Sequence, residues 1–245
     1  MTTRVLHIFA PYFRQRFGGP IYNWGFYFKK WDHPDIEHFV LDTEAGEVLP
    51  ARQAFDFDLK GDQKIVNQCE RLTWIFRLSR YLRRSRPEYD LVHFHLIWWG
   101  SLLSAWWTKR RRIPTLYESV LLGSDTPGAM RSEKLGRLKL RLLQRFTGIL
   151  AISEEIAVDY VNHGFSQAQV YTNMNCLDTD LFHPLDDPQD KACLRQKFNL
   201  PPEATVLLYV GSLIQRKGVD LLIQAFIEAH HINPQLHLCL VGPQN

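Results

Sequence analysis

Residues Leu207 to Phe226 read LLYVGSLIQRKGVDLLIQAF, and this stretch decides how the last part of the chain folds. Its apolar, β-rich start ends at Gly211, which permits a tight exit from a strand. Apolar residues then recur at helical spacing: Val219, Leu222, Ile223 and Phe226. A strand, a basic loop and a helix start predict the carboxyl edge of a doubly wound sheet, where helix N-termini and cations bind anions. We therefore expect Arg216 and Lys217 to bind an anionic ligand, with a diphosphate as the natural candidate.

Apolar β-like runs alternate with helical segments along the rest of the chain, which predicts an α/β fold with parallel strands and crossover helices. Strands are expected at Arg4–Phe9, Glu37–Leu41, Leu91–His95, Thr115–Glu118, Ile149–Ile152, Val170–Met174, Val206–Val210 and Leu236–Val241. Helices are expected at Tyr22–Trp31, Lys64–Ser85, Trp99–Lys109, Lys134–Phe146 and Glu154–His163. Ser153 is the expected N-cap of the last of these helices.

These elements predict three parts. Residues 1–174 form one complete Rossmann-like domain, residues 175–202 form a connector with one short helix, and residues 203–245 begin a second Rossmann-like domain. A strand–helix–strand unit of this size rarely buries enough surface to fold alone. The second domain is therefore expected to be incomplete within the 245 residues.

The cysteine content and the apolar runs indicate a cytoplasmic protein. The four cysteines, Cys69, Cys176, Cys193 and Cys239, show no C-x-x-C spacing, which suggests neither disulfides nor zinc. The amino terminus lacks the long apolar region of a signal peptide, and no stretch approaches the ~20 apolar residues of a membrane-spanning helix.

Basic residues gather in the middle of the chain. Between Val66 and Leu150 there are 16 Lys and Arg against 6 Asp and Glu, although the net charge of the whole chain is only +3. They line two predicted helices: Arg71, Arg77, Arg80, Arg83, Arg84 and Arg86 in one, and Arg131, Lys134, Arg137, Lys139, Arg141 and Arg145 in the other. Such helices can lie on the anionic inner face of a membrane, or they can simply be solvated helix faces. Nucleic acid is not an expected partner, because no recognition motif accompanies them.

Two pairs of residues near strand ends are further candidates for a site. Gly18 and Gly19 follow the first strand, and their backbone N–H groups could approach a phosphate, although a tight turn is the alternative. His93 and His95 lie two residues apart on a strand, so both side chains point to one face. A metal site needs a third ligand, which the sequence does not reveal, so packed and hydrogen-bonded histidines are the expected state and no metal is predicted.

Five segments, taken in order, share a pattern with one enzyme family. They are RQRFGGPIYNWGFYF from Arg14, YDLVHFH from Tyr89, AISEEIAVDYVNHGF from Ala151, MNCLDTDLFHP from Met174 and VGSLIQRKGVDLLIQAF from Val210. They resemble segments of family 4 retaining glycosyltransferases. The first is similar to the family's glycine-rich loop and first helix, the second to its D-V-V-H-x-H strand, and the third to its S-E segment. The fourth is similar to the N-G-V-D connector, and the fifth to the V-G-R-L…K-G-[VM]-D loop. The resemblance implies a GT-B architecture of two Rossmann-like domains.

The resemblance also implies a reaction. A hexosyl group would pass with retention from a nucleotide diphosphate sugar to a hydroxyl of a glycan or lipid-linked acceptor, as in envelope polysaccharide or glycolipid synthesis, without a metal or another cofactor. Lys217 and Arg216 would stabilise the departing diphosphate, and the donor would also contact Gly18, Gly19, Gly211 and Ser212. His95, Glu118 and Asp125 are candidates for binding acceptor or sugar hydroxyls, although Glu118 and Asp125 could instead cap turns.

The chain departs from the family pattern at several places, among them Cys176, which replaces the glycine of the N-G-V-D connector. Ser212 stands where the family has the arginine of V-G-R-L, and Val120 stands close to the position of a family histidine. The family's E-x7-E segment, which holds the donor's sugar and ribose, would lie beyond Asn245. We therefore expect these 245 residues alone to be inactive. The alternatives are a non-catalytic module that binds a membrane surface or a partner enzyme, and a sugar-nucleotide epimerase.

Overall fold

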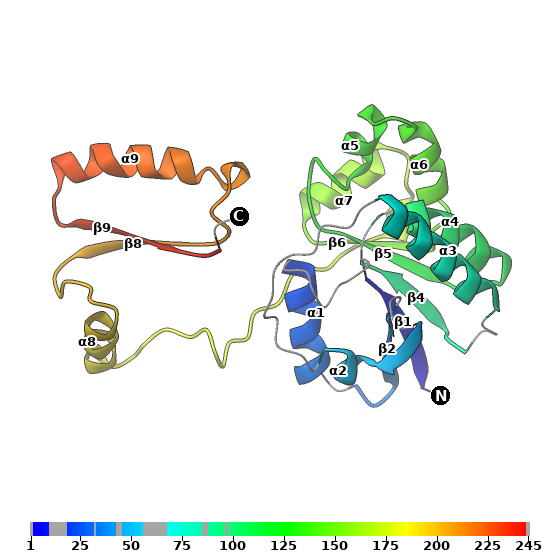
Figure 1. Ribbon diagram of the computed structural model, residues 1–245, viewed down its shortest axis with the longest axis horizontal. Helices are drawn as coiled ribbons and strands as arrows, with labels where there is room; N and C mark the ends of the chain where they lie inside the picture. Colours follow the sequence, from blue (N-terminus) through cyan, green and yellow to red (C-terminus); the bar gives the residue numbers. More distant parts are fainter. Residues whose placement is uncertain are drawn as a thin grey trace. The chain divides into compact units, whose positions relative to one another are not determined.

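The computed structural model describes residues 2–9, 19–31, 33–42, 46–55, 68–84, 88–95, 97 and 99–243. The chain forms two compact units, Met1–Cys176 and Leu177–Asn245, and Figure 1 shows the elements of each. Both units are α/β, and the first has the single Rossmann-like sheet that the sequence pattern predicts. The predicted fold class is therefore confirmed.

The first unit is built on a seven-stranded sheet with the strand order β3-β2-β1-β4-β5-β6-β7. The strands are β1 (Thr3–Ile8), β2 (Ile36–Asp42), β3 (Glu47–Pro50), β4 (Leu91–Phe94), β5 (Thr115–Ser119), β6 (Gly148–Ala151) and β7 (Val170–Thr172). All neighbouring strands are parallel except β2 and β3, which are antiparallel. The six strands predicted for this unit are present, within two residues at each end.

Helices connect the strands: α1 (Gly19–Lys30), α2 (Ala51–Ala54), α3 (Gln68–Arg84), α4 (Trp99–Arg110), α5 (Pro127–Ser132), α6 (Gly136–Leu143) and α7 (Glu154–Asn162), with the 3-10 turn η2 (Gln167–Gln169) before β7. The five predicted helices are present, whereas α2 and α5 were not predicted. Helix α6 is shorter than expected because Leu135, at its N-cap, has a left-handed φ of 64° that cannot continue a helix. Among the described residues, no helix is both long and apolar enough to cross a membrane.

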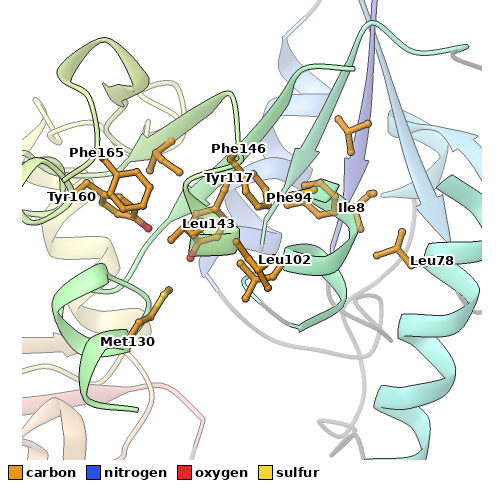
Figure 2. Packing of buried hydrophobic residues seen from close by; sticks show 14 of the residues in the cluster. Ile8, Leu78, Phe94, Leu102, Tyr117, Met130, Leu143, Phe146, Tyr160 and Phe165 are labelled. Carbon is orange, nitrogen blue, oxygen red and sulfur yellow. The ribbon is translucent and has the colours of Figure 1, made fainter. Parts of the chain in front are cut away.

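The two faces of this sheet are packed by different helices. Ile8 and Phe94 point to one face, where the main core also contains side chains of α3, α4 and α7 (Figure 2). Because side chains alternate along a strand, Val40 and Phe9 point to the opposite face, which α1 and α2 cover. Phe94, Tyr117 and Phe146 lie together in the main core, with the rings of Phe94 and Phe146 5.5 Å apart (Figure 2).

The second unit contains α8 (Pro188–Lys197), β8 (Thr205–Val210), the 3-10 turn η3 (Gln215–Lys217), α9 (Val219–Ile232) and β9 (Leu236–Val241). Strands β8 and β9 are parallel, so the predicted strand, basic loop and helix are confirmed. Little of this unit is buried: Ala204 and Val219 are its buried apolar residues among those described. Many large apolar side chains of β8 and α9 remain exposed, including Leu208, Val210, Leu221 and Ile227.

Candidate functional site

A buried carboxylate lies at the carboxyl end of β5. Glu118 is 5% exposed, and its Oε2 accepts hydrogen bonds from His95 Nδ1 at 2.9 Å and from Trp24 Nε1 at 2.8 Å. His95 directly follows β4, the neighbouring strand, while Trp24 comes from α1, which covers this face. The structure thus brings together two of the three predicted hydroxyl-binding candidates, His95 and Glu118, and adds Trp24, which the sequence pattern did not single out.

Hydrogen bonds continue from this pair across two further strands. His95 Nε2 lies 2.9 Å from His7 Nδ1, and His7 Nε2 lies 2.8 Å from His38 Nδ1. A consistent set of neutral tautomers has one proton on Nδ1 of each ring, so that His38 donates to His7, His7 to His95, and His95 to Glu118. The order β2-β1-β4-β5 makes this chain continuous, because each residue comes from the strand next to that of its partner.

His93 completes a cluster of imidazoles under α1. It pairs in register with His7, and its ring lies 4.1 Å from that of His95, so both strand histidines point to one face as predicted. The indole of Trp24 covers both rings, with centroid distances of 5.1 Å and 4.7 Å. Within the described part of the chain, the buried Nε2 of His93 has no hydrogen-bond partner.

Burial controls the charge of this cluster. Desolvation lowers the pKa of His7, His93 and His95 well below the ordinary value, and the neighbouring imidazoles lower the pKa of His7 and His93 further. These three rings are therefore neutral at physiological pH. Burial raises the pKa of Glu118, while His93 and the hydrogen bond from Trp24 act in the opposite direction. A carboxylate held in this way can accept a hydrogen bond or a proton from a hydroxyl group.

Asp125, the third hydroxyl-binding candidate, holds the loop that follows β5. Its carboxylate accepts the backbone N–H groups of Val120 and Leu121, each at 2.9 Å, and the hydroxyl of Ser119 at 3.1 Å. The Tyr160 hydroxyl donates to the backbone carbonyl of Asp125 at 3.3 Å. This geometry matches the turn-capping alternative raised by the sequence, and it places Val120 in the turn that Asp125 organises.

The basic loop of the second unit connects β8 to α9. Gly211 donates its N–H to Val241 at 2.9 Å, which ties the ends of β8 and β9 together. Arg216 and Lys217 lie exposed in η3, immediately before α9. Gly218 joins η3 to α9 with a φ of 66°, a conformation that disfavours other residues. Both cations therefore lie beside the N-terminus of a fourteen-residue helix, the position at which anions bind favourably.

Other sequence candidates lie at or outside the limits of the described residues. Gly19 is the first residue of α1, whereas Gly18 and Arg86 lie outside the described residues, as does the side chain of Arg71. Ser212 is half-buried, and its carbonyl accepts the hydroxyl of Tyr209 at 3.0 Å. Lys217 and Arg216 belong to the second unit, while Glu118, His95 and Asp125 belong to the first.

Comparison with known proteins links the first unit to one family. Residues 38–176, more than half of the chain, match the model of the glycosyl transferase 4-like domain. A D-inositol 3-phosphate glycosyltransferase of Catenulispora acidiphila is 30% identical over 148 residues, which are 57% of this chain and 33% of that protein. A similar enzyme of Xylanimonas cellulosilytica is 25% identical over 174 residues, 65% of this chain and 39% of that protein. The matched part of the chain thus spans about a third of the length of these relatives.

Solved structures share the architecture. HepE of Anabaena, in complex with UDP and glucose, superposes with a TM-score of 0.64 at 17% identity, over 98% of this chain and 61% of HepE. A UDP-GlcNAc 2-epimerase of Neisseria meningitidis superposes with a TM-score of 0.52 at 13% identity, over 99% of this chain and 66% of the epimerase. At this level of identity the likeness establishes the fold alone.

Proposed function

The chain belongs to the glycosyl transferase 4-like family, and we propose that it takes part in transferring a sugar from a nucleotide diphosphate sugar to an acceptor hydroxyl, with retention of anomeric configuration. One observation carries the proposal: Arg216 and Lys217 lie exposed at the N-terminus of α9, in the loop that follows the end of β8 at Gly211. Two neighbouring cations and a helix dipole at one corner provide the charge that a departing diphosphate needs.

The relatives supply the class of donor. Both curated relatives are glycosyltransferases, and HepE is described in complexes with UDP and with UDP-glucose. A uridine nucleotide sugar is therefore the donor to test first. No cofactor is proposed, because positioned cations can stabilise the leaving group without a metal ion.

On the acceptor side, Glu118 is the proposed contact in the first unit. Its Oε2 is already fixed by His95 and Trp24, so the carboxyl group has a defined orientation before any substrate arrives. A preoriented carboxylate at the carboxyl edge of a parallel sheet suits a sugar hydroxyl, because ligands of such sheets bind at that edge. A glycan or lipid-linked sugar fits this chemistry.

Titration of the full chain with UDP tests the donor site. Lys217→Ala is expected to weaken UDP binding roughly 10-fold or more, the usual effect of losing a hydrogen bond to a charged group. Lys191→Ala is the matched control, because Lys191 is an exposed lysine of α8 in the same unit. Equal UDP affinity for the wild type and Lys217→Ala would contradict the proposed donor site.

Product analysis tests the reaction. The protein purified from its own source is incubated with UDP-glucose in the presence and absence of a hydroxyl acceptor, and the anomeric configuration of the product is read by NMR. Retention in a product that forms only with the acceptor supports the proposal. A changed sugar nucleotide without any acceptor would instead indicate an epimerase. The intact mass of the same sample, compared with 28.7 kDa, tests the expectation that residues 203–245 begin a larger donor domain.

A second proposed role is attachment to an anionic membrane surface, which a specific observation favours. Leu72 and Phe76 of α3 are each 67% exposed, one helical turn apart, on a helix that also exposes Arg80 and Arg84. Apolar and basic side chains on one helix favour contact with anionic lipids. Helix α4 packs against both α3 and α6. Helix α6 also exposes Leu138 together with Arg137 and Arg141.

Co-sedimentation with anionic vesicles tests this role. The double variant Arg80→Glu/Arg84→Glu is expected to lose binding to vesicles of phosphatidylglycerol and phosphatidylcholine, since each basic residue near such a surface contributes about 1 kcal/mol. Lys191→Glu/Lys197→Glu makes the same change of charge on α8. Equal vesicle binding by both variants would show that the basic faces of α3 and α6 are exposed to solvent and do not bind the membrane.

A further inference from the structure

The side chains of three buried histidines lie close together beneath α1. One ring nitrogen each of His7, His93 and His95 lies within 4.8 Å of the other two. All three side chains are 1–2% exposed. The sequence suggested His93 and His95 as a pair without a third ligand, and His7 of the neighbouring strand β1 supplies the third.

The hydrogen bonds indicate which nitrogens face the centre. The outer nitrogen of His95, Nδ1, is held by Glu118, and the outer nitrogen of His7, Nε2, is held by His38. The inner nitrogens, His95 Nε2 and His7 Nδ1, face each other at 2.9 Å and therefore share one proton. His93 Nε2 is buried and has no partner among the described residues. Such an orphaned buried nitrogen is costly unless something binds it.

We propose that His7, His93 and His95 form a binding site for a zinc-class divalent cation, through His7 Nδ1, His93 Nε2 and His95 Nε2. Neutral imidazole is the ligand form of histidine, and it favours Zn²⁺ and its neighbours over Mg²⁺ or Ca²⁺, which prefer oxygen ligands. The cation would replace the proton shared by His7 and His95 and would give His93 Nε2 its partner.

The surroundings of the cluster match those of zinc-binding histidines. A metal-bound histidine usually donates its other N–H to a carboxylate or another acceptor, which fixes the ring. His95 already donates to Glu118, whose second donor is Trp24. Once the metal binds His7 Nδ1, the proton of His7 would lie on Nε2 and would be donated to His38 Nδ1. His38 would then carry its own proton on Nε2. The protons therefore rearrange among the hydrogen-bonded histidines, and binding of the metal releases no net proton.

A groove gives access to one end of the histidine chain. His38 lines a hollow of about 390 Å³ together with Trp31, His33, Pro50 and Arg52. Protons can exchange with solvent at His38 during the tautomer change. The metal itself reaches the cluster most readily before α1 has packed over it, so binding should be tested during folding as well as in the folded protein.

The experiment uses the untagged full chain, refolded in the presence of ZnCl₂ or CoCl₂ and then freed of excess metal. One equivalent of bound metal, visible absorption from Co²⁺ bound by the three imidazoles and a higher melting temperature in Zn²⁺ are expected. His93→Phe keeps an aromatic ring and loses only the ligand. It should weaken metal binding by ~100-fold or more, beyond the ~10–100-fold that loss of an outer partner costs. His183→Phe, at an exposed histidine of the second unit, should bind like the wild type.

The measurements on the wild type decide the proposal even if His93→Phe fails to fold. Less than a tenth of an equivalent of retained metal, with no visible Co²⁺ absorption, overturns it. A full equivalent that persists in folded His93→Phe also overturns it, because the metal then lies elsewhere. Neither result depends on sugar transfer, so failure of this inference and failure of the proposed function are distinguishable.

Discussion

Trp24 contributes to the candidate site through one hydrogen bond and through its ring. Trp24→Phe removes the donor to Glu118 and keeps an aromatic side chain against the histidines. We expect the free energy of unfolding to fall by about 1–3 kcal/mol, because a buried carboxylate oxygen loses one of its two hydrogen-bond donors and keeps only His95. Urea unfolding measures the change. Trp31→Phe is the control because Trp31 is 48% exposed, and an equal loss in both variants would show that the hydrogen bond is unimportant.

Asp125 provides a test by pH. Asp125→Asn replaces an oxygen that accepts a backbone N–H with an amide group that cannot, which should cost about 1–3 kcal/mol. Burial raises the pKa of Asp125, although the hydrogen bonds from Val120 and Leu121 act in the opposite direction, so the folded state binds this proton more tightly than the unfolded state does. The wild type therefore loses stability as the pH rises from the unfolded-state pKa through the folded-state pKa, and the variant does not.

The stability gap, which is the difference in unfolding free energy between the wild type and Asp125→Asn, should thus narrow as the pH rises above the ordinary pKa of an aspartate. Thermal unfolding at a series of pH values measures the gap. Asp186→Asn, at an exposed aspartate of the connector, should show a gap near zero at every pH. A gap that widens with pH would mean that the carboxylate is stabilised in the fold and that the pKa of Asp125 is lowered.

Sequence reasoning located part of the candidate site and missed its partners. The two-residue spacing of His93 and His95 correctly places both on one sheet face, because side chains alternate along a strand. His7, His38 and Trp24 could not be assigned to them, because these contacts depend on which strand lies beside which and on the helix that covers them. Local spacing carries no information on that order. The roles assigned to Lys217, Arg216, Gly211 and Ser212 remain predictions.

At the scale of single elements, the start of α7 gives a direct test of a predicted cap. The Ser153 hydroxyl accepts the N–H of Ile156 at 3.4 Å, as the Ser-Glu-Glu sequence predicts. Ser153→Ala should destabilise the first unit by about 1 kcal/mol, a typical cost of losing an N-cap. Ser166→Ala is the matched control, since Ser166 precedes η2 without a side-chain cap bond. Equal unfolding free energies for the two variants would contradict the capping role.

Among the strands of the first unit, sequence reasoning missed β3. It is only four residues long, ends in Pro50 and pairs antiparallel with β2, while the pattern of the chain favoured parallel strands joined by crossovers. Gly46 precedes it with a φ of 75° and donates its N–H to the carbonyl of Asp42 at 2.8 Å. A glycine in this conformation signals a local reversal, but a run as short as EVLP has no periodicity strong enough to indicate a strand.

At the scale of the whole molecule, the two units should differ in how readily they open. The first has a continuous core that extends from Leu6 to Val170, whereas the second buries few apolar side chains. We expect hydrogen exchange to be faster in β8, β9 and α9 than in β1, β4 and β5, because local opening follows the density of buried contacts. Mass spectrometry of peptic peptides measures this. Protection of β8 and β9 equal to that of β4 would show that a further partner covers them.

The two sheets also differ in their borders. The seven-stranded sheet is bounded by β3 and β7, of four and three residues, and β3 ends in a proline. Short or proline-containing borders offer an incoming peptide few backbone groups to pair with. Strands β8 and β9 each have six residues, and in the described part of the chain each has one side without a strand neighbour. Unwanted polymerisation of this protein should therefore nucleate on the two-stranded sheet, and solubilising changes belong on β8 and β9 rather than on the seven-stranded sheet.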